Sequence, residues 1–388
     1  MISSSTGSTR QVEIDLLRII AALIVFMYHY CDSFNYFSNI VPGNLIIGQY
    51  LRYGYMGVML FFVISGYVVT MSTMQKNTSE FATSRVVRLY PVFWLSCLTA
   101  ASLPRIFPFV HQFLPYPSVK ILLLNLSMVP TAFNTVMINP VFWSLLEEVH
   151  FYLIISFIIT FKLWPKVLNV IVIWLLIYAI QLLFGLGRSD DQIGILVPKH
   201  SLYFIAGMLF FLLQCKEFVR WKVGVLLLIT FILTIPVSNN FANFTNRFFK
   251  GPHMVSVYGY IIINLTIFAI FWLIAEKRLL IKSNKKIIMK FGDLTYPFYL
   301  IHLYGLGLYW YLRDKVQSQL LLILILLLTI GASYLIHRFY EKPLSRFMKK
   351  FKYKSVKLTD INANTKDQVI VGIDSGISTK AASSSVNR

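Results

Sequence analysis

Long apolar segments recur along most of the chain and are separated by short polar stretches. A helix that crosses a bilayer needs roughly 20 mostly apolar residues, and ten segments approach that length. They are 14–34, 53–71, 88–103, 141–163, 167–186, 193–213, 223–237, 255–274, 294–311 and 320–336. An eleventh, 119–129, is too short to span and has prolines on both sides, so we expect it to be interfacial or re-entrant. The pattern predicts an all-α polytopic membrane protein with about ten transmembrane helices.

Composition supports a membrane protein, and the charges predict its orientation. Hydrophobic residues make up 57% of the 388 residues and charged residues only 13%, which is unlike soluble proteins. The formal net charge is +20, but the basic residues lie in short blocks between apolar segments, which argues against nucleic acid as a partner. With the N-terminus in the cytoplasm, the densest basic blocks, 277–290 and 342–357, also lie inside, as the positive-inside rule requires. Both termini are therefore expected in the cytoplasm.

The chain divides into three parts by composition. Residues 1–12 form a polar N-terminal segment without a signal-peptide cleavage pattern. Residues 13–347 hold all the predicted spans, and 348–388 turn from basic to polar, which predicts a disordered cytoplasmic tail. The three cysteines have neither metal-ligand nor disulfide spacing, so we expect no metal site.

Ionisable side chains inside the predicted spans are few, and each is a functional candidate because a charge in the bilayer is costly. In the first span, Arg18 and His29 are eleven residues apart. They therefore share a helical face, with His29 roughly 16 Å further along the axis, near the middle of the membrane. A histidine bonded to a backbone carbonyl is the structural alternative for His29, and Arg18 could extend to the lipid headgroups.

Arg85 and Arg88 lie three residues apart, just before Tyr90 and Pro91, at the expected cytoplasmic start of the third span. Both guanidinium groups should project from one helical face. Such a pair suits bidentate binding of phosphates. A simple contribution to the positive-inside charge explains the pair equally well.

The fourth span carries Ser144, Glu148 and Tyr152 at intervals of four residues, so these side chains form one stripe. The neighbouring Glu147 should point roughly 100° away from Glu148. Two adjacent carboxylates followed by His150 are difficult to explain as packing inside a membrane span.

Two further features leave packing and function open. In the second span, residues 57–67 include small side chains that permit close helix packing, and the Ser65 hydroxyl could bond across such an interface. Packing is the simpler explanation there. The ninth span carries His302 three residues after Tyr299, and a structural histidine is as good an explanation as a substrate-binding one.

Several of these motifs, in this order, resemble the acyltransferase-3 family of integral membrane acyltransferases. Arg18 followed by His29 resembles the basic residue and histidine of its first helix. Residues 57–67, with Ser65 and Tyr67, resemble its second-helix pattern G-V-x-L-F-F-V-I-S-G-Y. The pair before Tyr90 and Pro91 is similar to its R-x-x-R motif.

The later motifs extend this resemblance to about residues 11–347. Residues 143–152 resemble the family pattern W-S-L-x-x-E-x-x-F-Y, in which the tryptophan is Trp143 and the glutamate is Glu148. Residues 294–302 and 333–343 match two late family elements. Glu147 departs from the pattern, because the family usually has an aliphatic residue at that place.

The resemblance implies an enzyme that moves an acyl group, often acetyl from acetyl-CoA, to a hydroxyl of an extracytoplasmic glycan such as the O-antigen of lipopolysaccharide. It implies that His29, Glu148 and Arg18 are catalytic and that Arg85 and Arg88 bind the acyl-CoA donor. Substrate-binding or structural roles are expected for Ser65, Tyr67, Trp143, Ser144, Tyr152 and His302.

The expected partners are a glycan or lipid-linked glycan acceptor and membrane lipids, in a bacterial cytoplasmic (inner) membrane. The main alternative is a transporter of glycans or lipid-linked sugars, because buried charges in polytopic helices also occur in carriers. Carriers commonly consist of two corresponding halves. Here the polar motifs of the first four spans have no evident counterpart later in the chain.

Overall fold

A computed structural model describes residues 10–30, 51–110, 114, 116–184, 200–248, 254–282 and 284–350. Regular structure in these ranges is helical throughout, without any strand. The main helices are α1 (Val12–Tyr28), α4 (Met56–Thr73), α5 (Thr78–Ile106), α6 (Val119–Asn125), α7 (Trp143–Thr160), α8 (Val167–Phe184), α9 (Ser201–Leu212), α10 (Arg220–Phe248), α11 (Val257–Ala275), α12 (Lys285–Ile301), α13 (Gly305–Leu312) and α14 (Ser318–Ile336). The predicted tail after residue 350, the first nine residues and parts of the first, fifth and sixth predicted spans lie outside the described residues.

Seven helices of the described chain are long and apolar enough to cross a membrane. They are Leu51–Thr73, Thr78–Ile106, Pro140–Thr160, Trp164–Phe184, Arg220–Arg247, Val257–Ala275 and Ser318–Lys350. The other predicted spans coincide with α1, with α9, and with α12 followed by α13. These three are shorter or carry more charge, but each lies within the same bundle. The protein is therefore an all-α polytopic membrane protein, as predicted.

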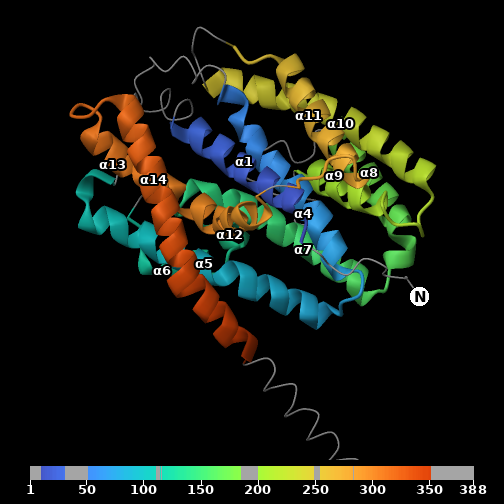
Figure 1. Ribbon diagram of the computed structural model, residues 1–388, viewed down its shortest axis with the longest axis horizontal. Coiled ribbons are helices and arrows are strands. Elements are labelled where there is room, and N and C mark those ends of the chain that lie inside the picture. The colour runs from blue at the N-terminus through green and yellow to red at the C-terminus, as the bar shows by residue number, and fades with distance from the viewer. Residues whose placement is uncertain are drawn as a thin grey trace, which may run out of the picture.

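The helices surround a central pair formed by α1 and α4 (Figure 1). In that view α8, α9, α10 and α11 lie on one side of the pair, and α5, α6, α13 and α14 lie on the other. A close helix contact joins α4 to α9 through Gly66 and Gly207. A Cβ atom on either glycine would lie 2.1 Å from a backbone oxygen of the other helix. The small residues of the second span thus serve close packing, as expected.

Two helices extend beyond the apolar segments that predicted them. The α5 helix begins ten residues before the predicted span 88–103, because Asn77 caps it: its side chain accepts a hydrogen bond from the Glu80 amide, and Glu80 reciprocates. Arg85 and Arg88 therefore lie inside the helix, not at its start. The last helix continues past Ile336 through Lys350, so the boundary predicted at residue 348 falls inside a helix.

The short eleventh apolar segment doubles back along α5. Arg105 donates to the Pro117 carbonyl at 3.0 Å, and Trp94 donates to the Leu126 carbonyl at 3.1 Å. Nearer the start of α5, Tyr90 donates to the Ser127 carbonyl at 3.0 Å. These contacts place the segment antiparallel to α5 and favour the re-entrant over the interfacial interpretation.

Candidate functional site

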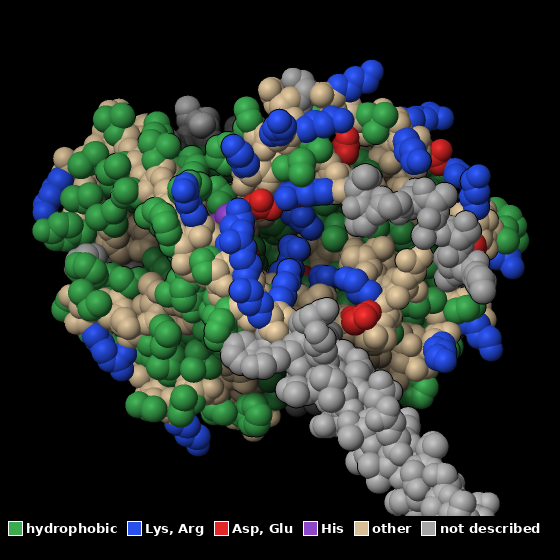
Figure 2. Space-filling model, turned by 60° about the horizontal axis from the view of Figure 1, so that its bottom comes forward, with side chains coloured by type: hydrophobic (Ala, Val, Ile, Leu, Met, Phe, Trp, Pro, Cys, Tyr) green, Lys and Arg blue, Asp and Glu red, His purple; other side chains and the backbone are tan. Residues whose placement is uncertain are grey.

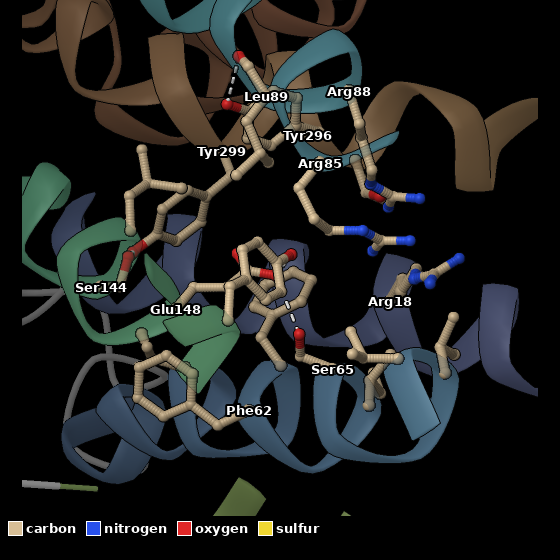
Figure 3. Close-up of a pocket in the computed structure, with 18 residues that line it drawn as sticks. Arg18, Phe62, Ser65, Arg85, Arg88, Leu89, Ser144, Glu148, Tyr296 and Tyr299 are labelled. Atoms are coloured by element: carbon tan, nitrogen blue, oxygen red, sulfur yellow. Dashed lines mark hydrogen bonds between the residues drawn. The ribbon is translucent and has the colours of Figure 1, made fainter. Parts of the chain in front are cut away.

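A cavity of about 100 Å³ lies between α1, α4, α5, α7 and α12. Figure 3 shows its two ends. Arg18, Arg85 and Arg88 extend into one end, while Ser144 and Tyr299 close the other. We call this space the arginine cavity. Glu148 lies between the two ends. Polar side chains are therefore found along the whole length of the cavity, among mainly apolar lining residues.

A buried carboxylate holds the first arginine in place. Asp15 is fully buried and accepts a hydrogen bond from Arg18 at 3.0 Å. Arg10 also bonds to Asp15, and its Nη1 atom lies 2.7 Å from Asp293 of α12. Asp15 packs directly on Gly292, where a Cβ atom would lie 2.8 Å from its side chain. The start of α1 is therefore tied to α12, which fixes the direction of Arg18.

Arg85 and Arg88 have a different environment. The Arg85 guanidinium lies over the rings of Phe81 and Tyr152, 5.4 and 5.5 Å from their centroids. Among the described residues, neither arginine forms an ion pair with a carboxylate. Burial and the nearby Arg85 cation lower the pKa of Lys76, which precedes α5. This end of the cavity thus has a positive potential suited to an anion.

Glu148 connects two helices at the middle of the cavity. Its Oε1 atom accepts a hydrogen bond from Ser65 of α4 at 2.8 Å and another from Tyr152, one turn further along α7. Ser144, Glu148 and Tyr152 all line the cavity, which confirms the predicted stripe. The hydroxyl of Ser65 bonds across the helix interface, as its position in the second span suggested.

A pair of histidines lies beyond the end of the cavity that Ser144 and Tyr299 close. The Tyr299 hydroxyl lies 2.7 Å from Ser144 Oγ, and the backbone carbonyl of Tyr299 lies 2.6 Å from His302 Nδ1. The other ring nitrogen of His302, Nε2, lies 3.2 Å from His29 Nδ1. The His29 Nδ1 atom is also 2.9 Å from the Val25 carbonyl. His29 and His302 therefore contact each other one helical turn beyond the cavity.

For two neutral rings, one arrangement of protons satisfies all of these contacts. A carbonyl oxygen can only accept, so His302 Nδ1 donates to Tyr299 and His302 Nε2 carries a lone pair. His29 Nδ1 then donates to Val25 and His302, which places the lone pair of His29 on Nε2. In this arrangement the His29 Nε2 atom can accept a proton. Tyr30 donates to the His302 carbonyl at 2.7 Å and fixes the second ring's backbone.

Four predicted site residues do not line this cavity: the two histidines beyond its end, and Tyr67 and Trp143 elsewhere in the bundle. Tyr67 is fully buried on another face of α4, where its hydroxyl accepts a hydrogen bond from Gln214 and its ring packs on Phe211. Trp143 stacks on Tyr55 with ring centroids 5.6 Å apart. Both residues contribute packing at the places where the structure puts them.

Trp143 belongs to a second polar region, which we call the Glu147 cluster: Tyr55, Trp143, Glu147 and His200. Glu147 is only 2% exposed, and its Oε2 atom lies 3.3 Å from the His200 backbone nitrogen and 3.6 Å from His200 Nδ1. The His200 ring lies 5.2 Å from the Trp143 ring, and its Nε2 atom is 3.3 Å from the Tyr55 hydroxyl. This carboxylate is enclosed by packed aromatic side chains.

Three features of the site were not predicted from the sequence. They are the contact between His29 and His302, the position of Tyr299 at the end of the cavity, and the ion pair of Arg18 with Asp15. Two of them had a signal. Tyr299 and His302 are three residues apart and share a helical face, and so do the opposite charges Asp15 and Arg18. The contact between the histidines joins residues 273 apart and had no local signal.

These groups are chemically suited to anion binding and to proton transfer. Arg85 and Arg88, which have no carboxylate partner among the described residues, face one end beside the paired Arg18, and His29 lies beyond the other end. Within the described ranges, no group of three or more histidine, cysteine or acidic side chains could hold a metal ion.

Comparison with known proteins identifies the family. The family model of the acyltransferase-3 group, described as an acyltransferase domain, matches residues 11–338. No curated protein and no solved structure match the chain. The matched range includes every helix that lines the arginine cavity and both histidines, and it favours an acyltransferase over a transporter. The chain therefore belongs to the acyltransferase-3 family and is an integral membrane acyltransferase.

Proposed function

We propose that this protein transfers a short acyl group, namely acetyl, from cytoplasmic acyl-CoA to a hydroxyl of an extracytoplasmic glycan. One observation carries the proposal: α1 holds Arg18, which lines the arginine cavity, and His29 follows at the end of the same helix, eleven residues further along. That spacing corresponds to roughly 16 Å along the helix axis. Donor and acceptor can therefore approach from opposite sides and meet between the two.

The donor side is the end of the bundle that carries Arg18, Arg85 and Arg88, which we call the basic face. Figure 2 shows Lys and Arg side chains gathered around a hollow on this face, which the positive-inside rule assigns to the cytoplasm. Arg85 and Arg88 suit the phosphates of CoA because guanidinium groups bind phosphate oxygens in pairs. The cavity of about 100 Å³ is far below the roughly 300–1,000 Å³ of pockets for larger ligands, which favours a short acyl group.

The transfer step follows from the state of His29. Its Nε2 atom takes the proton of the acceptor hydroxyl as the hydroxyl oxygen attacks the thioester carbonyl. A carbon–oxygen bond forms, the carbon–sulfur bond breaks, and the proton passes from His29 to the leaving thiolate of CoA. His302 holds the His29 ring by accepting from Nδ1. A route through an acyl-histidine intermediate uses the same nitrogen as nucleophile.

Glu148 belongs to the substrate-binding part of this mechanism. Its hydrogen bonds come from Ser65 and Tyr152, and the carboxylate faces the cavity in which the donor would lie. We therefore assign it to positioning the substrates rather than to orienting His29, which His302 contacts instead.

The nature of the acceptor and the membrane rest on the family resemblance. A surface glycan such as the O-antigen, or its lipid-linked precursor, and a bacterial inner membrane are the proposed acceptor and location. Mass spectrometry of surface glycans from cells with and without the gene tests this part. Identical acetylation in both would exclude a glycan acceptor in that organism.

His29→Ala tests the catalytic assignment. Membranes with matched expression receive radiolabelled acetyl-CoA, and label in the glycan fraction and free CoA thiol are measured. Transfer should fall at least about 100-fold, the usual contribution of a general base. The control is His150→Ala, which should retain activity. His150 lies on α7, does not line the arginine cavity and is not one of the two paired histidines. Near-normal transfer by His29→Ala would refute the assignment.

Arg85→Ala and Arg88→Ala test the donor site by affinity rather than by rate. Each variant loses a cation that faces the cavity, so the Kd for acetyl-CoA should rise about tenfold, which corresponds to about 1.4 kcal/mol. Lys166→Ala, outside the cavity, is the control. If both variants bound acetyl-CoA with unchanged affinity, Arg85 and Arg88 would have a role in membrane topology only.

A further inference from the structure

A second cavity, of about 800 Å³, lies on another side of α12, between α12 and the long last helix. It shares no lining residue with the arginine cavity. We call it the α12–α14 groove and define it by Lys290, Leu294, Gly331, Arg338, Lys342 and Arg346. Nothing in the proposed transfer reaction uses these residues.

The groove changes character along its length. Leu294, Ile330 and Gly331 line one end, within the apolar part of the bundle, and Arg346 lies at the other. Sixteen residues separate Ile330 from Arg346, which is roughly 24 Å along a helix. A Cβ atom on Gly331 would have no atom within 4 Å, so the apolar end is open space.

The basic end of the groove carries uncompensated charge. Its acidic lining residue, Asp293, is 2.7 Å from Arg10 and 4.0 Å from His337, so its charge is already balanced. Its four cations are Lys290, Arg338, Lys342 and Arg346. In the part of the chain that the structure describes, none of these four lies within 4.0 Å of a carboxylate. An anionic group from outside the protein would complete the site.

The groove also opens toward the bilayer. Leu327, Leu328 and Leu335 on the same helix are 61%, 51% and 55% exposed, which on a membrane-spanning helix means contact with lipid tails. An occupant can therefore enter sideways from the membrane. Its apolar part would lie beside lipid-facing residues, and its anionic part would lie at the basic face.

We propose that the α12–α14 groove binds an anionic phospholipid of the cytoplasmic leaflet. The headgroup phosphate lies among Arg338, Lys342 and Arg346, and one acyl chain follows Leu294 and Gly331. Basic pockets between transmembrane helices on this side of a membrane are typical sites for such headgroups. The proposal stands independently of the acyl-transfer reaction, because it concerns lipid binding alone.

The first test measures lipid retention by native mass spectrometry on the purified full-length protein. Phosphatidylglycerol is added to the detergent-solubilised protein, with phosphatidylcholine as the neutral comparison. The triple variant Arg338→Gln, Lys342→Gln, Arg346→Gln should raise the Kd for phosphatidylglycerol about 100-fold. Each lost cation is expected to raise this Kd by a factor of about ten or less. A control triple, Lys166→Gln, Lys216→Gln and Lys222→Gln, removes the same charge outside the groove and should change the Kd by less than about twofold. Equal losses in both triples would overturn the proposal, because they would show a general charge effect.

The second test separates a lipid from another phosphate ligand. Gly331→Phe leaves every cation in place and fills the open apolar end, at a position where Phe is at least as compatible with a helix as Gly. It should weaken phosphatidylglycerol binding about tenfold and leave acetyl-CoA binding unchanged. Undiminished lipid binding by Gly331→Phe would refute the proposed acyl-chain position. Displacement of phosphatidylglycerol by acetyl-CoA, together with loss of acetyl-CoA binding in the groove triple, would assign the groove to the nucleotide end of the donor.

Discussion

Glu147 and Glu148 are consecutive residues of α7, and their side chains face two different surroundings. Glu148 lines the arginine cavity and accepts hydrogen bonds from Ser65 and Tyr152. Glu147 points into the Glu147 cluster, where His200 and packed aromatic rings enclose it. A helix turns roughly 100° per residue, so adjacent side chains need not share any neighbour.

The difference shows two ways in which a membrane protein accommodates a buried carboxylate. Such a group is costly in a bilayer unless polar partners surround it. The Glu147 cluster supplies those partners from the protein, and Glu147 lines neither the arginine cavity nor the α12–α14 groove, so we expect its carboxylate to contribute to stability. Glu148 retains a face toward a cavity that also contains arginines, so a substrate can reach it. A charge within a span is thus a functional candidate only when part of it faces a cavity.

Among the replacements that compare the two glutamates, Glu148→Ala should have the largest effect on activity. The carboxylate positions groups within the cavity, so acetyl transfer from labelled acetyl-CoA should fall about 100-fold, as expected when reacting groups are misplaced. Ser65 and Tyr152 can turn to water in the cavity, so the apparent melting temperature should change little. A variant that transfers acetyl at a near-normal rate would remove Glu148 from the mechanism.

Replacement of Glu147 by Ala should instead reduce stability. It leaves the His200 backbone N–H group without its acceptor in a closed apolar environment, at a cost of about 2 kcal/mol in the free energy of unfolding. Thermal unfolding followed by size-exclusion chromatography measures this loss, and transfer is then compared per folded molecule. If Glu147→Ala lost as much activity per folded molecule as Glu148→Ala, the two glutamates would not differ as the structure indicates.

Hydropathy predicted the spans because the membrane requires apolar length, but it could not predict where helices end. The α5 helix begins at the Asn77 cap, and the last helix continues to Lys350, both in polar sequence. These ends depend on capping and on contacts with other helices such as the bond from Ser345 to the Val87 carbonyl. A hydrophobic pattern contains no information on either.

Periodicity predicted which site residues share a helical face, and it placed Ser144, Glu148 and Tyr152 correctly. It could not predict partners on different helices. Ser65 and Glu148 are 83 residues apart and meet only because α4 and α7 lie side by side around the cavity. That arrangement depends on close packing elsewhere, such as the contact of Gly66 with Gly207, and not on any feature local to the glutamate.

Ser65→Ala should produce the smallest effect and most directly tests the polar connection around Glu148. The variant removes one of two hydrogen bonds to Glu148 Oε1 and leaves the bond from Tyr152. A single hydrogen bond contributes about 1 kcal/mol, so kcat/KM for acetyl transfer should fall about fivefold.

The matched control is Ser72→Ala, two turns further along α4. The Ser72 hydroxyl bonds to the carbonyl of Val69 in its own helix, and the residue does not line the arginine cavity. Its loss should leave kcat/KM within about twofold of the parent protein, because an exchange of a hydroxyl on the helix surface costs little. Equal rates in the two variants would mean that Glu148 does not need Ser65. The functional difference between the neighbouring glutamates would then depend on access to the cavity alone.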